Sequence, residues 1–398
     1  MLMLMYNISH IIKAQLEITS RCNASCPACS RNISGGPISP TVVPEDLTLN
    51  DIQQMFPMEI IKNLIYLNYC GNLGDPGLAK NLIEIITFFK QNGNDSLIQH
   101  IKTNGGMHKP DRWIKLGKLF QKKYVPGHPL SHSGVTFSVD GLADTNHIYR
   151  RGVIWNNVYR NMQAYSDSGG YGVWEWLIFD HNKHQIDDAQ DLANKLGFSF
   201  IIKQPVGFGE LNGKRTPMQV LNKNGKYAYS IWPADHIGDK IELNYKMEYD
   251  PIWGQPVEKL SEFSSQLGKK SCIKCKSLHQ PQFGEEIFVS ASGHLLPCCY
   301  LGGAFEQRNS SYSRRQFNEM VNKIGYDTFN LRKHNMIDIL QGPAFNKFFM
   351  EGWNKPSIEE GKILFCVEVC GEESTIDKIY DHTKLTSLSK FIPIRHIA

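Results

Sequence analysis

The sequence predicts an α/β protein, with a parallel sheet flanked by helices in its first half and a smaller α+β region after it. Three observations lead to this prediction. Strand-like and helix-like segments alternate from about residue 12 to 205, this alternation stops near residue 206, and six of the ten cysteines lie beyond residue 270 around a hairpin-like segment. The 398 residues are enough to bury one large core and a smaller one.

Apolar periodicity gives the elements of the first half in chain order. The predicted strands are Ala14–Thr19, Leu64–Leu67, Leu97–Thr103, Gly134–Val139, Val173–Phe179 and Phe198–Lys203. Helical spacing runs from Leu78 to a stop at Gly93, from Pro110, over Trp155–Tyr165, and over Gln185–Leu196. Such alternation requires parallel strands joined by right-handed crossovers, in an open doubly wound sheet or a barrel.

Four loops follow the predicted strands and carry the polar residues of interest. They are a cysteine loop after Thr19, the segment Cys70–Pro76, the turn Asn104-Gly105-Gly106 and the pair Asp140-Gly141. In parallel sheets and barrels, ligands bind at the carboxyl ends of the strands. We therefore expect these four loops to form one rim with a common function.

The cysteine loop holds Cys22, Cys26 and Cys29. Three thiolates can ligate three irons of a cubane iron–sulfur cluster, and no further cysteine follows nearby, so one iron would stay open for chemistry. Zinc sites and disulfides also use closely spaced cysteines. Zinc usually needs a fourth ligand, however, and neither His10 nor Cys70 is spaced as a partner for these three.

The amino terminus and the charge pattern limit the possible compartments and partners. The first residues lack a cationic start and a cleavable small-residue site, and no apolar run approaches the roughly 18 residues that span a bilayer. We expect a soluble protein of the reducing cytoplasm, with no membrane partner and no disulfide framework. The net charge of +4 is spread along the chain without a lysine or arginine block, so nucleic acid is not an expected partner.

The Cys-X3-Cys-X2-Cys spacing of Cys22, Cys26 and Cys29, placed after the first strand, resembles the radical S-adenosylmethionine (SAM) enzymes. The resemblance covers about residues 12–205. It implies a partial (β/α)6 TIM barrel as the radical SAM core, a [4Fe–4S] cluster on the three cysteines, and SAM bound to the open iron through its amino and carboxylate groups.

Other motifs extend this resemblance to the SAM contacts. Gly74-Asp75-Pro76 is similar to the family's Gly-Gly-Glu-Pro motif, which implies that Asp75 meets the methionine ammonium, although its side chain is one methylene shorter than glutamate. Asn104 matches the third-strand turn. Ser138 and Arg150 correspond to residues that meet the methionine carboxylate, and Asp140 corresponds to an acid near the ribose.

Beyond residue 205 we expect a bridging region at 206–255, an auxiliary domain at 256–375 and a tail at 376–398. The segment Glu286–Cys299 predicts a β-hairpin that delivers a cysteine. With the late Cys-X3-Cys, this pattern resembles the SPASM and twitch modules and implies one auxiliary [4Fe–4S] cluster, hence two clusters in the chain. The implied ligands are Cys275, Cys298, Cys366 and Cys370. Cys272 could replace Cys275, Cys299 could replace Cys298, and zinc is an alternative for this quartet.

The resemblance implies an enzyme that abstracts hydrogen from a peptide or protein, as in peptide natural-product maturation. The cluster loop begins at Cys22, which leaves no room for an N-terminal recognition domain, so a separate peptide-recognition protein is expected. A reductant such as flavodoxin or ferredoxin is a further expected partner. The alternatives are a small-molecule dehydrogenase or epimerase, and a cluster-binding or zinc-binding protein without turnover.

Overall fold

The computed structural model describes residues 6–121, 132–211, 214–235, 273–275, 277–278, 285–307 and 312–371. Their main feature is an eight-stranded sheet in the order β12-β11-β1-β2-β3-β4-β5-β6, in which every neighbouring pair is parallel except β12 and β11. The strands are β1 Ile11–Leu16, β2 Tyr66–Tyr69, β3 Ile98–Thr103, β4 Gly134–Ser138, β5 Gly172–Leu177, β6 Ser199–Lys203, β11 Glu285–Val289 and β12 Leu295–Leu296. The predicted α/β class is confirmed.

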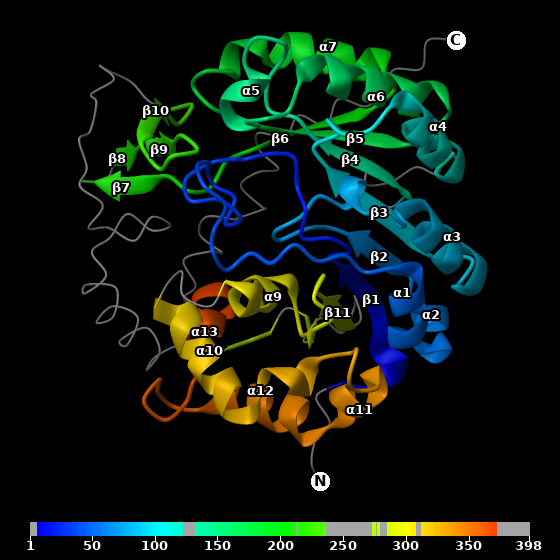
Figure 1. Ribbon diagram of the computed structural model, residues 1–398, viewed down its shortest axis with the longest axis vertical. Helices are drawn as coiled ribbons and strands as arrows, with labels where there is room; N and C mark the ends of the chain where they lie inside the picture. The colour runs from blue at the N-terminus through cyan, green and yellow to red at the C-terminus, as the bar shows by residue number, and fades with distance from the viewer. Residues whose placement is uncertain are drawn as a thin grey trace.

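Helices cover one side of this curved sheet (Figure 1). They are α1 Leu49–Met55, α2 Met58–Asn63, α3 Leu82–Asn92, α4 Pro110–Leu119, α5 Asn146–Tyr149, α6 Trp155–Asp167 and α7 Ile186–Lys195. The ring of Phe137 on β4 lies 5.4 Å from Trp113 of α4, and Trp174 on β5 lies 6.3 Å from Trp155 of α6. Since alternate residues of a strand point to opposite faces, the residues flanking Trp174 face away from these helices.

The six predicted strands all form, but the first ends three residues earlier than its apolar pattern indicated. Residues after Leu16 pair with a returning loop instead of a strand. Ile18 accepts a hydrogen bond from the amide of Leu47 (2.9 Å), and Thr19 forms an isolated bridge with Asp46. This pairing turns the chain out of the sheet immediately before the cysteine loop.

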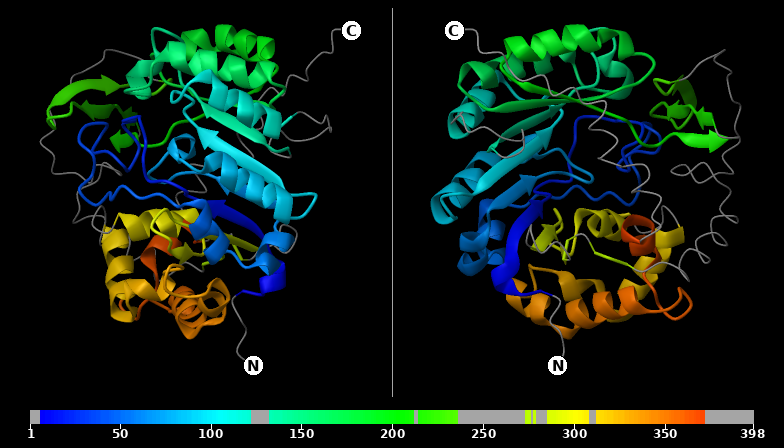
Figure 2. Two further views of the ribbon diagram at one scale, coloured as in Figure 1. Left: turned by 45° about the vertical axis from the view of Figure 1, so that its right-hand side comes forward. Right: turned by 180° about the vertical axis from the view of Figure 1, so that it is seen from behind.

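The predicted hairpin also forms, and it continues the core sheet instead of building a sheet of its own. Its first strand, β11, runs parallel to β1 with Gln15 opposite Phe288 and Leu16 opposite Val289. Figure 2 shows the yellow-to-red helices gathered at this edge of the sheet. They are α9 Cys299–Glu306, α10 Tyr312–Ile324, α11 Met336–Gln341, α12 Pro343–Asn354 and α13 Leu364–Cys370.

The predicted bridging region contains two small antiparallel hairpins. They are β7 Gly209–Leu211 with β8 Lys214–Thr216, and β9 Met218–Leu221 with β10 Tyr227–Ile231. Residues 236–272 and the tail from residue 372 lie outside the described residues, and the domain boundaries stay predictions. Within the part of the chain that the structure describes, no helix is both long and apolar enough to cross a bilayer.

Candidate functional site

The cysteine loop follows β1 and folds as a compact set of turns. The amide of Cys29 donates to the carbonyl of Cys26 (3.1 Å), and the amide of Ala24 donates to the sulfur of Cys22 (3.4 Å). All three cysteines are free thiols, and Cys26 is 7% exposed. Burial raises the pKa of Cys22 to about 12 and that of Cys29 to about 11, and the charges of the neighbouring cysteines add to both shifts.

This donor set fits an iron–sulfur cluster. Buried thiols with raised pKa values stay protonated when no cation is bound. A bound metal displaces these protons and stabilises the thiolates. Arg150 approaches the same sulfurs, because its Nη1 donates to Cys26 Sγ at 3.7 Å. Its charge lowers the cost of thiolate at Cys26, although burial still raises the pKa of that thiol overall.

A single metal ion requires a different arrangement. Among the described residues, no group of three or more His, Cys, Asp or Glu side chains is placed to hold one metal ion. A zinc ion needs its ligands to converge on a point at about 2.3 Å from sulfur. In a cubane cluster each thiolate binds a separate iron, so the cysteines surround the cluster and do not converge.

Asp75 lies at the carboxyl end of β2 and connects two loops of the rim. Its Oδ1 accepts from Thr103 Oγ1 (2.7 Å) and the amide of Gly77 (2.9 Å), and its Oδ2 accepts from the amide of Asn104 (2.7 Å). Gly74 packs against the segment between β1 and the cysteine loop, so closely that a Cβ at this position would lie 1.8 Å from the carbonyl oxygen of Thr19. Asp75 is 5% exposed, and these contacts all lie within the protein.

Asn104 connects the third-strand turn to the cysteine loop. Its Nδ2 donates to Asn23 Oδ1 at 2.9 Å and lies 3.9 Å from Cys22 Sγ. Its Oδ1 accepts from the amide of Gly106 (2.9 Å), which holds the side chain in place. The predicted convergence of the first, second and third loops is therefore present in the structure.

The fourth-strand motif meets the same loop through an ion pair. Asp140 is fully buried, and its Oδ2 accepts from Arg150 Nε at 2.5 Å while its Oδ1 accepts from the amide of Leu177 (2.6 Å). Burial raises the pKa of Asp140, and the guanidinium of Arg150 offsets part of that increase. Ser138, the last residue of β4, is also buried. Arg150 thus joins the acid of this motif to Cys26.

We expect Arg150→Met to lower the free energy of unfolding by about 3–5 kcal/mol, because it leaves the carboxylate of Asp140 buried without its partner. Urea unfolding followed by circular dichroism measures the change. The matched control is Arg332→Met, which breaks an ion pair with Asp51 in which the arginine is 38% exposed and which is worth at most about 1 kcal/mol. Equal losses in the two variants would contradict a structural role for the buried pair.

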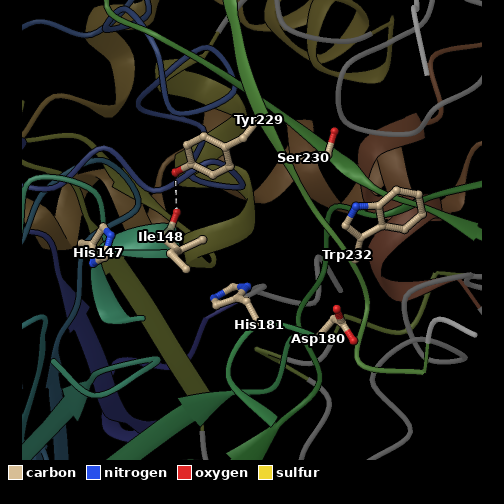
Figure 3. Close-up of a pocket in the computed structure, with 7 residues that line it drawn as sticks. All are labelled: His147, Ile148, Asp180, His181, Tyr229, Ser230 and Trp232. Carbon is tan, nitrogen blue, oxygen red and sulfur yellow. Dashed lines mark hydrogen bonds between the residues drawn. The ribbon is translucent and has the colours of Figure 1, made fainter. Parts of the chain in front are cut away.

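A cavity of about 390 Å³ opens beside the rim (Figure 3). Its lining comes from α5, the loop after β5, and β10 with the residue that follows it: His147, Ile148, Asp180, His181, Tyr229, Ser230 and Trp232. The hydroxyl of Tyr229 donates to the carbonyl of Ile148 at 2.6 Å, and Arg151 lies 5.7 Å from the ring of Tyr229. The carbonyl of Arg151 also accepts from the amide of Ser25, which connects Tyr229 of this cavity to the cysteine loop through Arg151. Aromatic and imidazole rings suit a planar ligand group.

A second cavity, of about 340 Å³, lies between Glu17, the loop around Val43 and the hairpin turn. Glu17 follows the last residue of β1, and although it is an acid it is only 1% exposed. Its Oε1 accepts from the amides of Leu73 (2.6 Å) and Gly74 (3.1 Å), and burial raises its pKa to about 7. Only the loop that folds over it reveals this role, so periodicity could not have found it.

The predicted auxiliary cysteines belong to the hairpin and the helices at the β12–β11 edge of the sheet, and to a segment that pairs with the end of α13. Burial has the largest effect on the pKa values of Cys275 and Cys298 and raises both. The charge of Cys370 adds to the increase at Cys275, and the charges of Cys299, Cys275 and Cys366 add to the increase at Cys298. The indole Nε1 of Trp353 donates to Cys366 Sγ at 3.4 Å. Cys275 thus interacts electrostatically with Cys298, Cys366 and Cys370, and the ligand set stays a prediction. Cys272 lies outside the described residues.

Cys299 faces a different group from its neighbour Cys298. Cys298 is the N-cap of α9, and Cys299 is the first helical residue. Gln15 forms a hydrogen bond with the thiol of Cys299 and accepts another from Cys70 Sγ at 3.3 Å. The choice between Cys298 and Cys299 stays a prediction, because the charge of Cys299 also raises the pKa of Cys298.

The comparisons with known proteins give distant structural likenesses. No protein-family model and no curated protein sequence matches the chain. SuiB of Streptococcus suis bound to S-adenosylmethionine is 13% identical, with a TM-score of 0.42 over 74% of this chain and 61% of its own. SuiB bound to precursor peptide SuiA is 12% identical, with a TM-score of 0.48 over 90% of this chain and 71% of its own. Hexahistidine-tagged anSMEcpe with bound AdoMet is 11% identical, with a TM-score of 0.45 over 95% of this chain and 95% of its own. All three TM-scores lie below 0.5, so these likenesses assign no function to the chain.

Proposed function

We propose that this chain is a radical SAM enzyme. The observation that carries the proposal is the group of three free, largely buried cysteines, Cys22, Cys26 and Cys29, at the carboxyl end of a parallel sheet. These residues would hold a [4Fe–4S] cluster and leave one iron for the amino and carboxylate groups of SAM. Such a cluster, when bound, supplies the electron that cleaves the SAM sulfonium to a 5′-deoxyadenosyl radical.

The surrounding residues support this function by fixing the rim. Asp75 holds the second and third loops together through three hydrogen bonds, so we assign it to positioning the loops around SAM. Arg150 presents a guanidinium beside Cys26, where it can meet the methionine carboxylate. Asn104 and Ser138 complete the predicted contacts, and Asp140 orients Arg150. Burial of these groups limits the access of water to a reactive radical.

We assign the second cysteine group to one auxiliary [4Fe–4S] cluster of the twitch type, held by Cys275, Cys298, Cys366 and Cys370. Its support is the electrostatic interaction of Cys275 with each of the other three thiols. Complete ligation by four cysteines suits electron transfer to or from the substrate.

The substrate proposed is a peptide or protein, as the similarity of the C-terminal cysteine pattern to the auxiliary modules of peptide-modifying enzymes implies. A separate recognition protein and a flavodoxin or ferredoxin would act with it in the cytoplasm. A small-molecule dehydrogenase or epimerase is the second candidate. Mass spectrometry of a co-expressed peptide, compared with 5′-deoxyadenosine formation on small alcohols or sugars, separates the two.

Anaerobic reconstitution tests the proposal. We expect about eight irons and eight sulfides per chain, and 5′-deoxyadenosine on addition of SAM and dithionite. An iron content of about four per chain would contradict the assignment of an auxiliary cluster and leave the assignment of a radical SAM enzyme in place. Bound zinc without iron, or iron without SAM cleavage, would overturn the proposal in favour of a binding protein without turnover.

A further inference from the structure

The inner face of the sheet, away from the covering helices, carries a group of charged side chains that the proposed SAM site does not use. Trp174 of β5 contacts Trp155 of α6, so its neighbour Glu175 points to the opposite face. Lys102 of β3 and Lys203 of β6 reach Glu175 from either side. Three strands therefore direct charge to one place on the inner face.

Each carboxylate oxygen of Glu175 forms an ion pair with a different lysine. Lys102 Nζ lies 2.7 Å from Oε2, and Lys203 Nζ contacts Oε1. The Glu175 side chain is 9% exposed, while those of Lys102 and Lys203 are 45% and 39% exposed. Two ammonium groups on one carboxylate leave a net charge of +1, and each ammonium has donors to spare for a ligand that approaches from the open side.

Other acids of this face do not cancel that charge. Glu286 of β11 accepts from Gln15 through its Oε1. Burial raises the pKa of Glu286, and the charge of Lys13 offsets part of that increase. Within the described residues, no further carboxylate forms an ion pair with Lys102 or Lys203.

His100 adds an independent observation. It precedes Lys102 by two residues on β3 and so points to the same face. It is 2% exposed, and in the described part of the chain its Nε2 has no hydrogen-bond partner. Burial and the charge of Lys102 lower the pKa of His100 to about 4, so the ring is neutral at physiological pH and can donate one N–H without adding charge. A buried polar atom without a partner is costly unless a ligand satisfies it.

We propose that Lys102, Lys203 and His100 bind a carboxylate group of the substrate on this inner face. The inference rests on the proposed function, because it names the chemistry of the substrate that would lie beneath the rim. A monoanionic carboxylate matches the net charge of +1, whereas a phosphate dianion would leave excess negative charge in a partly buried site. In a peptide, the group would be the terminal carboxylate or that of an aspartate or glutamate.

Binding of small carboxylates to the full chain tests this site without iron or SAM. The probes are N-acetylglycine for a chain terminus, N-acetylglutamate α-amide for a side chain and neutral N-acetylglycinamide, each followed by saturation-transfer NMR. Inorganic phosphate is followed by its displacement of the carboxylate that binds. We expect at least one carboxylate probe to bind and the neutral amide not to bind. Whichever carboxylate binds more tightly identifies its source. Phosphate binding more tightly than both would overturn the assignment.

Two variants test the two lysines. Glu175→Gln frees both ammonium groups, and we expect it to strengthen carboxylate binding several-fold. The triple variant Lys102→Met, Glu175→Gln and Lys203→Met avoids a stranded buried carboxylate, and we expect at least about tenfold weaker binding. Lys80→Met, which removes one exposed lysine elsewhere, is the control and should bind as the parent does.

A purely structural ion cluster predicts the opposite result. Glu175→Gln would then lower stability without improving carboxylate binding, and the triple variant would bind the probes as the parent does. The outcomes are also separable from the proposed function. SAM cleavage without carboxylate binding would overturn only this site, and carboxylate binding without SAM cleavage would overturn only the enzyme assignment.

Discussion

Replacing Cys26 with alanine is expected to abolish the formation of 5′-deoxyadenosine and to remove about four irons per chain, leaving only the auxiliary cluster. The reason is coordination: a cubane held by three thiolates has no spare protein ligand, so the loss of one leaves two irons without protein donors. Cys26 is also the sulfur that Arg150 contacts, so its loss leaves a guanidinium without its thiolate neighbour. Iron and sulfide analysis and quantification of the nucleoside product after anaerobic reconstitution measure both effects.

Cys70→Ala is the matched control for this experiment. Cys70 is a free thiol near the end of the neighbouring strand, and its sulfur donates to Gln15 away from the trio. We expect this variant to keep its iron and to cleave SAM. If Cys26→Ala retains the full iron content or cleaves SAM at the rate of the parent, the cysteine trio is not the cluster site.

The sequence was sufficient to predict the parallel sheet because periodicity reports which residues of a segment are buried. The rim followed from the same logic, since parallel strands must place their carboxyl ends together. The contacts of Asn104 with Asn23 and of Arg150 with Cys26 agree with that expectation.

The partner of a strand was harder to predict. Residues Glu286 to Val289 have the pattern of a strand, but nothing in that pattern says that it pairs with β1. The two segments lie about 270 residues apart in the chain, yet Gln15 donates a hydrogen bond to Glu286. Pairing at that separation depends on the tertiary fold, which brings an open sheet edge to the hairpin.

Local motifs were also limited in what they could say of side-chain roles. The motif around Asp75 implies a direct contact with the methionine ammonium, which stays a prediction. The structure adds a second role, because both carboxylate oxygens of Asp75 accept hydrogen bonds within the rim. The role of Glu17 was equally hidden from the local sequence, because its carboxylate accepts hydrogen bonds from amides of a loop more than 50 residues away. Short polar side chains near a strand end can hold the site or touch the ligand, and spacing alone does not separate these roles.

Cys366→Ala is expected to remove about four of eight irons while leaving SAM cleavage in place, and to stop conversion of the substrate. Cys366 is 7% exposed among Cys275 and Cys370, whose charges raise its pKa after the larger effect of burial. The auxiliary cluster would therefore lose one of four ligands without any change at the cysteine loop. Uncoupled 5′-deoxyadenosine formation, compared with product formation by mass spectrometry, measures the separation of the two activities.

Two further variants make this result specific. Cys366→Ala also deprives Trp353 Nε1 of its acceptor, so Cys370→Ala tests the same cluster without that loss. Cys299→Ala is the control, because we assign Cys298 to the quartet and because the thiol of Cys299 bonds with Gln15 on the sheet. We expect the first two variants to behave alike and the control to match the parent. Equal loss of SAM cleavage and substrate conversion, in protein with the parent's circular dichroism spectrum, would show that the two cysteine groups do not have separate roles.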